Sequence, residues 1–116
     1  MRALLVILVL AGCADDGLDD RAYRRLVEPF DSYDQCLADT SQASCYQTFV
    51  LCGNGRVMMD LDNRPVDGTY AMEGSLARAR VEGDLIVFDT EKLSSAQLPG
   101  RRWELASPSF YGCDVE

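Results

Sequence analysis

Arg56-Val57-Met58-Met59-Asp60-Leu61-Asp62 is the clearest strand pattern in this chain, because its side chains alternate between the two faces of an extended backbone. Val57, Met59 and Leu61 fall on one face. A period of two is typical of a strand that buries one face. Gly53-Asn54-Gly55 precedes the stretch and is typical of a tight β-hairpin turn. These residues predict an antiparallel hairpin.

The same pattern extends over most of the body. Strands are expected over residues 46–52, 56–62, 69–73, 77–81, 85–89 and 102–106, and a loop with one helical turn over 90–100. Turns are expected at Asn63-Arg64-Pro65 with Asp67-Gly68, at Gly74-Ser75 and at Glu82-Gly83-Asp84. Short, evenly spaced strands predict a mainly β fold, a small antiparallel meander that forms a barrel or a sandwich. The residues expected to point inward are Phe49, Leu51, Met59, Leu61, Tyr70, Met72, Ile86, Phe88 and Trp103.

The segment before this meander is less regular. Over residues 20–28, Ala22, Tyr23, Leu26 and Val27 recur at helical spacing and Pro29 follows, which predicts a short helix. The alternative is an extended first strand. Residues 36–45 are small and polar, and they read as a loop.

The N-terminus has the composition of a signal peptide. Met1-Arg2 is basic, residues 3–10 are uninterruptedly apolar, and the run is too short to span a membrane as a helix. Leu10-Ala11-Gly12-Cys13 then resembles the lipobox of bacterial lipoproteins. The resemblance implies cleavage before Cys13, a diacylglyceryl group on its thiol and acylation of its new amino terminus. Several acyl chains anchor a protein more firmly than one.

This resemblance divides the chain into a signal peptide (1–12), a lipidated acidic tether (13–20) and a single β-rich domain (21–116). It places the protein in a bacterial cell envelope. Ala14 differs from the aspartate that resembles an inner-membrane retention signal, which favours the outer membrane.

The cysteine count agrees with an exported lipoprotein. The chain has five cysteines, and lipidation of Cys13 leaves Cys36, Cys45, Cys52 and Cys113 for disulfides in an oxidising compartment. Four cysteines allow three pairings. We favour Cys36–Cys45, which closes a polar loop, with Cys52–Cys113, which fastens the tail to the body. No Cys-x-x-Cys pair is present, so we expect neither a zinc site nor a thioredoxin-like site.

Charge limits the partners. The formal net charge is −8, and removal of residues 1–12 takes away one arginine and no acidic residue. Such a surface repels nucleic acid and gains nothing from anionic lipid head groups, so we expect no nucleic-acid partner. The membrane link is expected through acyl chains.

No catalytic motif is apparent. The chain has no histidine, which removes the commonest general base and the commonest metal ligand. Asp60, Asp62 and Asp67 could offer oxygen ligands to calcium, but alternation places the first two on a solvated face. We therefore expect no enzyme activity, metal site or cofactor.

Two functions remain. The first is an envelope binding or structural module that acts through protein contacts. The aromatic pair Phe110-Tyr111 could serve such contacts, although packing over the open end of the sheet is the favoured role. The second is a carrier of a small apolar ligand, because Gly68-Thr69-Tyr70, Phe88-Asp89 and Trp103 resemble small lipocalin-like domains. The bulky inward residues favour a filled interior and hence the first function.

Overall fold

The computed structural model describes residues 19–41, 44–61, 63–107 and 113. The predicted signal peptide, the lipobox-like residues 10–13, most of the predicted tether, Asp62 and Phe110-Tyr111 lie outside the described residues. Within the described ranges, no helix is both long enough and apolar enough to cross a membrane.

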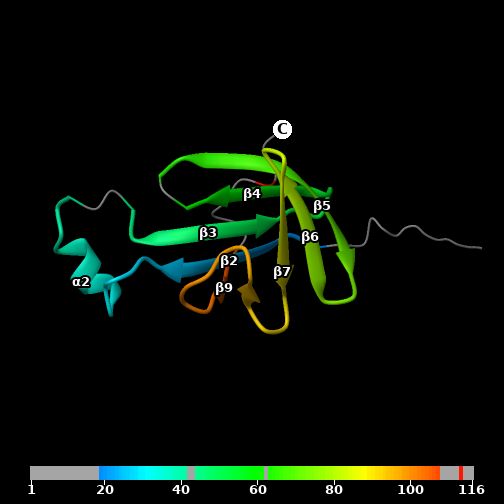
Figure 1. Cartoon of the computed structure of the whole chain (residues 1–116). Helices are drawn as coiled ribbons and strands as arrows, with labels where there is room; N and C mark the ends of the chain where they lie inside the picture. Colours follow the sequence, from blue (N-terminus) through cyan, green and yellow to red (C-terminus); the bar gives the residue numbers. More distant parts are fainter. Residues whose placement is uncertain (1–18, 42–43, 62, 108–112, 114–116) are drawn as a thin grey trace, which may run out of the picture.

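One eight-stranded antiparallel sheet makes up the body, in the order β8-β7-β6-β5-β4-β3-β2-β9. The sheet curls into a half-barrel (Figure 1), which agrees with the predicted mainly β meander. Its last strand returns to pair with its first. The strands are β2 (Arg21–Leu26), β3 (Tyr46–Leu51), β4 (Arg56–Asp60), β5 (Pro65–Glu73), β6 (Leu76–Val81), β7 (Asp84–Asp89), β8 (Ser94–Ser95) and β9 (Glu104–Ala106), and one helix, α2 (Tyr33–Leu37), lies between β2 and β3.

The hairpin turns follow the expected chemistry. After β3, Cys52 N donates to the Arg56 carbonyl at 2.8 Å, and Gly55 takes a positive φ of 92°. Between β6 and β7, Glu82 and Gly83 have φ values of 52° and 87°. Positive φ at both central residues gives a turn whose twist matches that of paired strands. The turns at 53–55 and 82–84 are therefore confirmed.

The turn expected at Asp67-Gly68 is wrong, because β5 runs unbroken from Pro65 to Glu73. Gly68 serves a close approach of two strands instead. A Cβ at this position would collide with the backbone carbonyl oxygen of Arg80 on β6. A glycine inside a strand marks either a turn or such an approach, and local sequence does not distinguish them.

Replacing Gly68 by alanine is expected to lower the free energy of unfolding by about 1–3 kcal/mol, because β5 and β6 must move apart to admit the methyl group. Chemical denaturation measures the change. Ala71→Ser, which adds one atom on the exposed face of the same strand, is the matched control and should stay within about 0.5 kcal/mol of wild type. Equal losses from the two substitutions would contradict the close-approach role.

The helix expected over residues 20–28 is also wrong: Arg21–Leu26 is the strand β2, as in the alternative interpretation. Pairing with β3 on one side and with β9 on the other satisfies its backbone groups. Tyr23 and Arg25 share the inward face, whereas Ala22 is buried on the outward face. Because Arg25 points inward and Ala22 is buried on the outward face, the apolar and polar residues of this strand do not alternate in the sequence.

Residues 27–41 and 44–45 belong to an arm that leaves the sheet between β2 and β3 (Figure 1). The loop predicted over 36–45 is partly helical, because α2 covers Tyr33–Leu37. Ser32 caps this helix, its hydroxyl accepting a hydrogen bond from Gln35 N at 3.1 Å.

The loop that was predicted to hold one helical turn over residues 90–100 follows β7. It contains one helix-like hydrogen bond, from Leu93 N to the Asp89 carbonyl (2.8 Å), and then the short strand β8.

The main core fills the inside of the half-barrel. All nine residues predicted to point inward are buried in this core or packed against it. Phe88 lies at its centre, with its ring centroid 4.8 Å from that of Tyr23, 4.7 Å from Phe49 and 5.7 Å from Trp103. Trp103 N also donates to the Leu93 carbonyl (3.0 Å), which ties the segment before β9 to the segment before β8.

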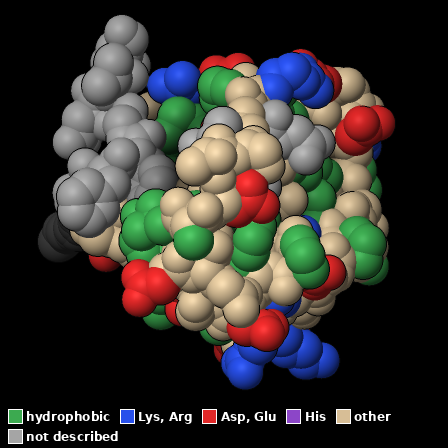
Figure 2. Space-filling view, turned by 90° about the vertical axis from the view of Figure 1, so that its left-hand side faces the viewer, with side chains coloured by type: hydrophobic (Ala, Val, Ile, Leu, Met, Phe, Trp, Pro, Cys, Tyr) green, Lys and Arg blue, Asp and Glu red, His purple; other side chains and the backbone are tan. Residues whose placement is uncertain are grey.

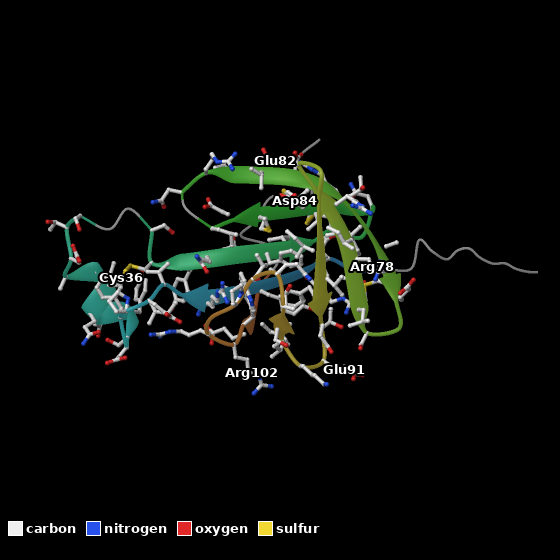
Figure 3. The ribbon with its side chains drawn as sticks, in the orientation of Figure 1. Cys36, Arg78, Glu82, Asp84, Glu91 and Arg102 are labelled. Carbon is white, nitrogen blue, oxygen red and sulfur yellow. A yellow bond between two sulfur atoms is a disulfide. The ribbon has the colours of Figure 1, made fainter. Side chains whose placement is uncertain are left out.

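Both favoured disulfides are present. Cys36–Cys45 closes the arm, with its Cα atoms 5.8 Å apart (Figure 3). Cys52–Cys113 lies in a second apolar cluster with Ala22 and Val50, on the outer face of the sheet, and its Cα atoms are 5.5 Å apart. The predicted pairing is therefore confirmed.

Candidate functional site

A pocket with a volume of about 400 Å³ opens at the end of the half-barrel beside the arm. Three parts of the chain line it: residues 25–28 at the end of β2, residues 99–101 before β9, and, at the same end of the sheet, Ser44, Tyr46, Gln47, Leu61 and Asn63. The volume falls within the range of small-molecule sites. This pocket is the candidate functional site.

Arg25 is the most constrained side chain of the pocket. It is 8% exposed. Its Nε donates to Gln47 Oε1 at 2.7 Å, and its Nη1 donates to the carbonyl oxygens of Leu98 (3.1 Å) and Arg101 (2.9 Å). The guanidinium carbon lies 4.4 Å from the ring centroid of Trp103. These contacts hold the guanidinium in one position.

One end of this guanidinium makes no hydrogen bond to the described part of the chain. The three hydrogen bonds use Nε and Nη1, and within the described ranges Nη2 makes none. In the described part of the chain, Trp103 Nε1 is the side-chain atom that is both fully buried and without a hydrogen-bond partner. Because Arg25 Nη2 also has no hydrogen-bond partner but is not such an atom, it retains access to solvent. Since Arg25 lines the pocket, we infer that Nη2 is available there.

Two more charges border the pocket. Arg101 Nε lies 4.0 Å from Glu28 Oε2. Burial lowers the pKa of Arg25 from its ordinary value, and the nearby Glu28 carboxylate opposes this by raising it. An arginine stays protonated through such shifts at neutral pH. The pocket thus holds two positive groups and one negative group, in a chain whose net charge is −8.

Gly100 permits this arrangement. Its φ is +127°, and a Cβ there would lie 3.2 Å from Arg25 Nη1 and 3.6 Å from Glu28 Oε2. A larger residue would push the loop away from both charged groups. The loop over residues 98–101 can therefore present two carbonyl oxygens to the buried guanidinium.

The carboxylates considered for calcium do not meet in the described part of the chain. Asp67 pairs with Arg56 across the β4–β5 hairpin at 3.2 Å, and Asp62 lies outside the described residues. Asp20, Cys52 and Cys113 do lie close together. However, the two sulfurs form a disulfide, and Asp20 accepts a hydrogen bond from Gly53 N at 2.7 Å. Metal binding by cysteine needs thiolates, so this group is structural.

Sequence reasoning missed Arg25, Glu28 and Arg101. The cysteines that were predicted to form disulfides lie in the arm and on the outer face of the sheet, and none of them lines the pocket. One local signal was present: if residues 21–26 are read as a strand, Arg25 shares the face of Tyr23. The carbonyl oxygens that make its burial tolerable come from distant residues.

The arm presents a second surface. Tyr33 and Leu37 on α2 are 48% and 57% exposed. The Tyr33 ring stacks on Tyr46 at 5.5 Å between centroids, and the Arg24 guanidinium carbon lies 4.2 Å from the Tyr46 ring centroid. On the face shown in Figure 2, exposed apolar and acidic side chains lie side by side over the middle. We call Tyr33 and Leu37 the arm patch.

No protein-family model, curated protein or solved structure matches this chain.

Proposed function

We propose that this chain is a lipoprotein of a bacterial cell envelope, anchored through Cys13 in the outer membrane. Its folded part acts as a binding module through protein contacts. The observation that carries the proposal is the use of cysteine: the two disulfides take up four of the five cysteines, and the fifth is the lipobox residue Cys13. Disulfides persist in the oxidising compartments to which proteins are exported. Bacterial lipoproteins are exported proteins too.

The arm patch is the surface we propose for those contacts. Exposed Tyr33 and Leu37 lie together on a short helix that a disulfide holds at its base. Such residues give apolar contact area at low cost in conformational entropy when their backbone is already constrained. No catalytic role is part of the proposal.

The apolar-carrier alternative has less support. Its ligand would occupy the inside of the half-barrel, which is filled by the packed rings of Tyr23, Phe49, Phe88 and Trp103. The pocket lies at the end of the half-barrel and carries charged side chains. A buried charge is costly to cover with an apolar ligand.

Cys13→Ser tests the anchor. In a bacterial host, the intact mass of the wild-type protein should equal residues 13–116 plus acyl chains, and the protein should sediment with membranes. The variant should lack the acyl mass and leave the membrane fraction, because the thiol that carries the lipid is gone. The Cys36→Ser/Cys45→Ser double variant is the control and should keep its acyl mass. A wild-type protein without acyl mass would refute the proposal.

The contact surface is tested in the same strain with a photo-crosslinking residue. At position 37, on the arm patch, irradiation should give a discrete protein adduct. At position 91, an exposed site near the opposite end of the sheet (Figure 3), it should give none. An identical adduct from both positions would contradict a role for the arm patch.

A further inference from the structure

We propose that the pocket at the end of the half-barrel binds a small molecule through a carboxylate group held by Arg25 and Arg101. The inference goes beyond the proposed envelope function. It does not depend on the anchor, because the residues that line the pocket all fall between positions 25 and 101.

Arg25 offers a donor that is already in place. Stacking on Trp103 and hydrogen bonds to Gln47, Leu98 and Arg101 orient its guanidinium before any ligand arrives. Nη2 then projects its N–H bonds toward an acceptor at no further cost of ordering the side chain. Preorganisation of this kind raises affinity, and hydrogen bonds between guanidinium and carboxylate are among the strongest in proteins.

The local charge selects the kind of anion. Arg25 and Arg101 contribute two positive charges, and Glu28, 4.0 Å from Arg101, offsets one of them. The remaining single positive charge suits a monoanion such as a carboxylate. A doubly charged phosphate would meet repulsion from Glu28 at close range.

The rest of the wall limits the size of the molecule. Leu26, Leu61 and Pro99 give apolar contact area, and Tyr46 borders the mouth near the arm. The 400 Å³ volume equals that of about a dozen water molecules. An amino acid or a dipeptide fits this space, with its side chain on the apolar wall and its carboxylate on the guanidinium groups.

The probe for the test is the dipeptide alanyl-alanine, added to the purified full chain. Isothermal calorimetry gives the affinity. The fluorescence of Trp103 reports on Arg25, because Trp103 is the chain's single tryptophan and lies under that guanidinium. We expect alanyl-alanine to bind and to change the emission. Its C-terminal amide should bind at least about tenfold more weakly, because the charged acceptor is gone.

Arg101→Gln should weaken binding of alanyl-alanine by about tenfold, since it removes one of the two cations. Arg102→Gln is the matched control: Arg102 is exposed, points away from the sheet (Figure 3) and does not line the pocket, so affinity should not change. Arg25→Lys keeps the charge but loses the planar fork, and it should also weaken binding. Should that variant fail to fold, Arg101→Gln still decides the question.

Three results would each overturn the proposal. The first is equal affinity for alanyl-alanine and its amide. The second is tighter binding of inorganic phosphate than of the dipeptide. The third is no binding of the dipeptide at millimolar concentration with unchanged Trp103 emission. Because none of these readouts involves the membrane, failure here would leave the Cys13 experiment unaffected.

Discussion

Replacing both Cys52 and Cys113 by alanine is expected to lower the free energy of unfolding by about 4 kcal/mol. The bridge closes a loop of 61 residues, and removing such a constraint lets the unfolded chain gain conformational entropy. The loss is a large share of the stability of a small domain. Cys113 also covers part of the outer apolar cluster with Ala22 and Val50, and this packing disappears with the bridge.

The other disulfide supplies the control. Cys36–Cys45 spans nine residues, so the corresponding double alanine variant should lose only about 2.5 kcal/mol. Guanidinium denaturation of the two variants and of wild type, without reductant, compares them directly. A larger loss from the arm disulfide than from Cys52–Cys113 would contradict the assignment of the long bridge as the principal covalent constraint.

Phe88→Ala should destabilise the protein by about 3–5 kcal/mol, because it leaves a cavity where three other aromatic rings meet. Phe88 is fully buried, and on the neighbouring strand it faces Ala77, whose small side chain makes room for the ring. Denaturation with urea gives the free energy, and near-ultraviolet circular dichroism reports on the packing of Trp103.

Leu105→Ala is the matched control for this experiment. Leu105 is 67% exposed on the edge strand β9, so truncating its side chain leaves no enclosed cavity. We expect a change within about 0.5 kcal/mol. A loss from Phe88→Ala as small as that of the control would mean that the aromatic cluster does not hold the half-barrel together.

Residues that interact over short distances along the chain were predicted well. The period of two over residues 56–61 and the glycines at 53, 55 and 83 define hairpins, and the structure has them. The residues predicted to point inward were correct for the same reason. In a strand, successive side chains point to opposite faces, so one correctly placed residue assigns its neighbours.

The errors came from residues whose environment lies elsewhere in the sequence. Arg25 was not singled out from the sequence, because arginine is seldom buried without partners. Its partners are the side chain of Gln47 and the carbonyl oxygens of Leu98 and Arg101. Gly68 looked like a turn because the Arg80 carbonyl that requires it lies on another strand.

By itself, the sequence determined the hairpins, the inward face and an even set of four cysteines besides Cys13, because these depend on local alternation, turn geometry and residue counts. Tertiary structure alone decided that residues 21–26 form a strand paired with β9, and that three distant segments enclose a pocket around Arg25. The physical reason is that burying a charged group is tolerable only where acceptors converge on it. Folding brings those acceptors together, and no local pattern records where they will meet.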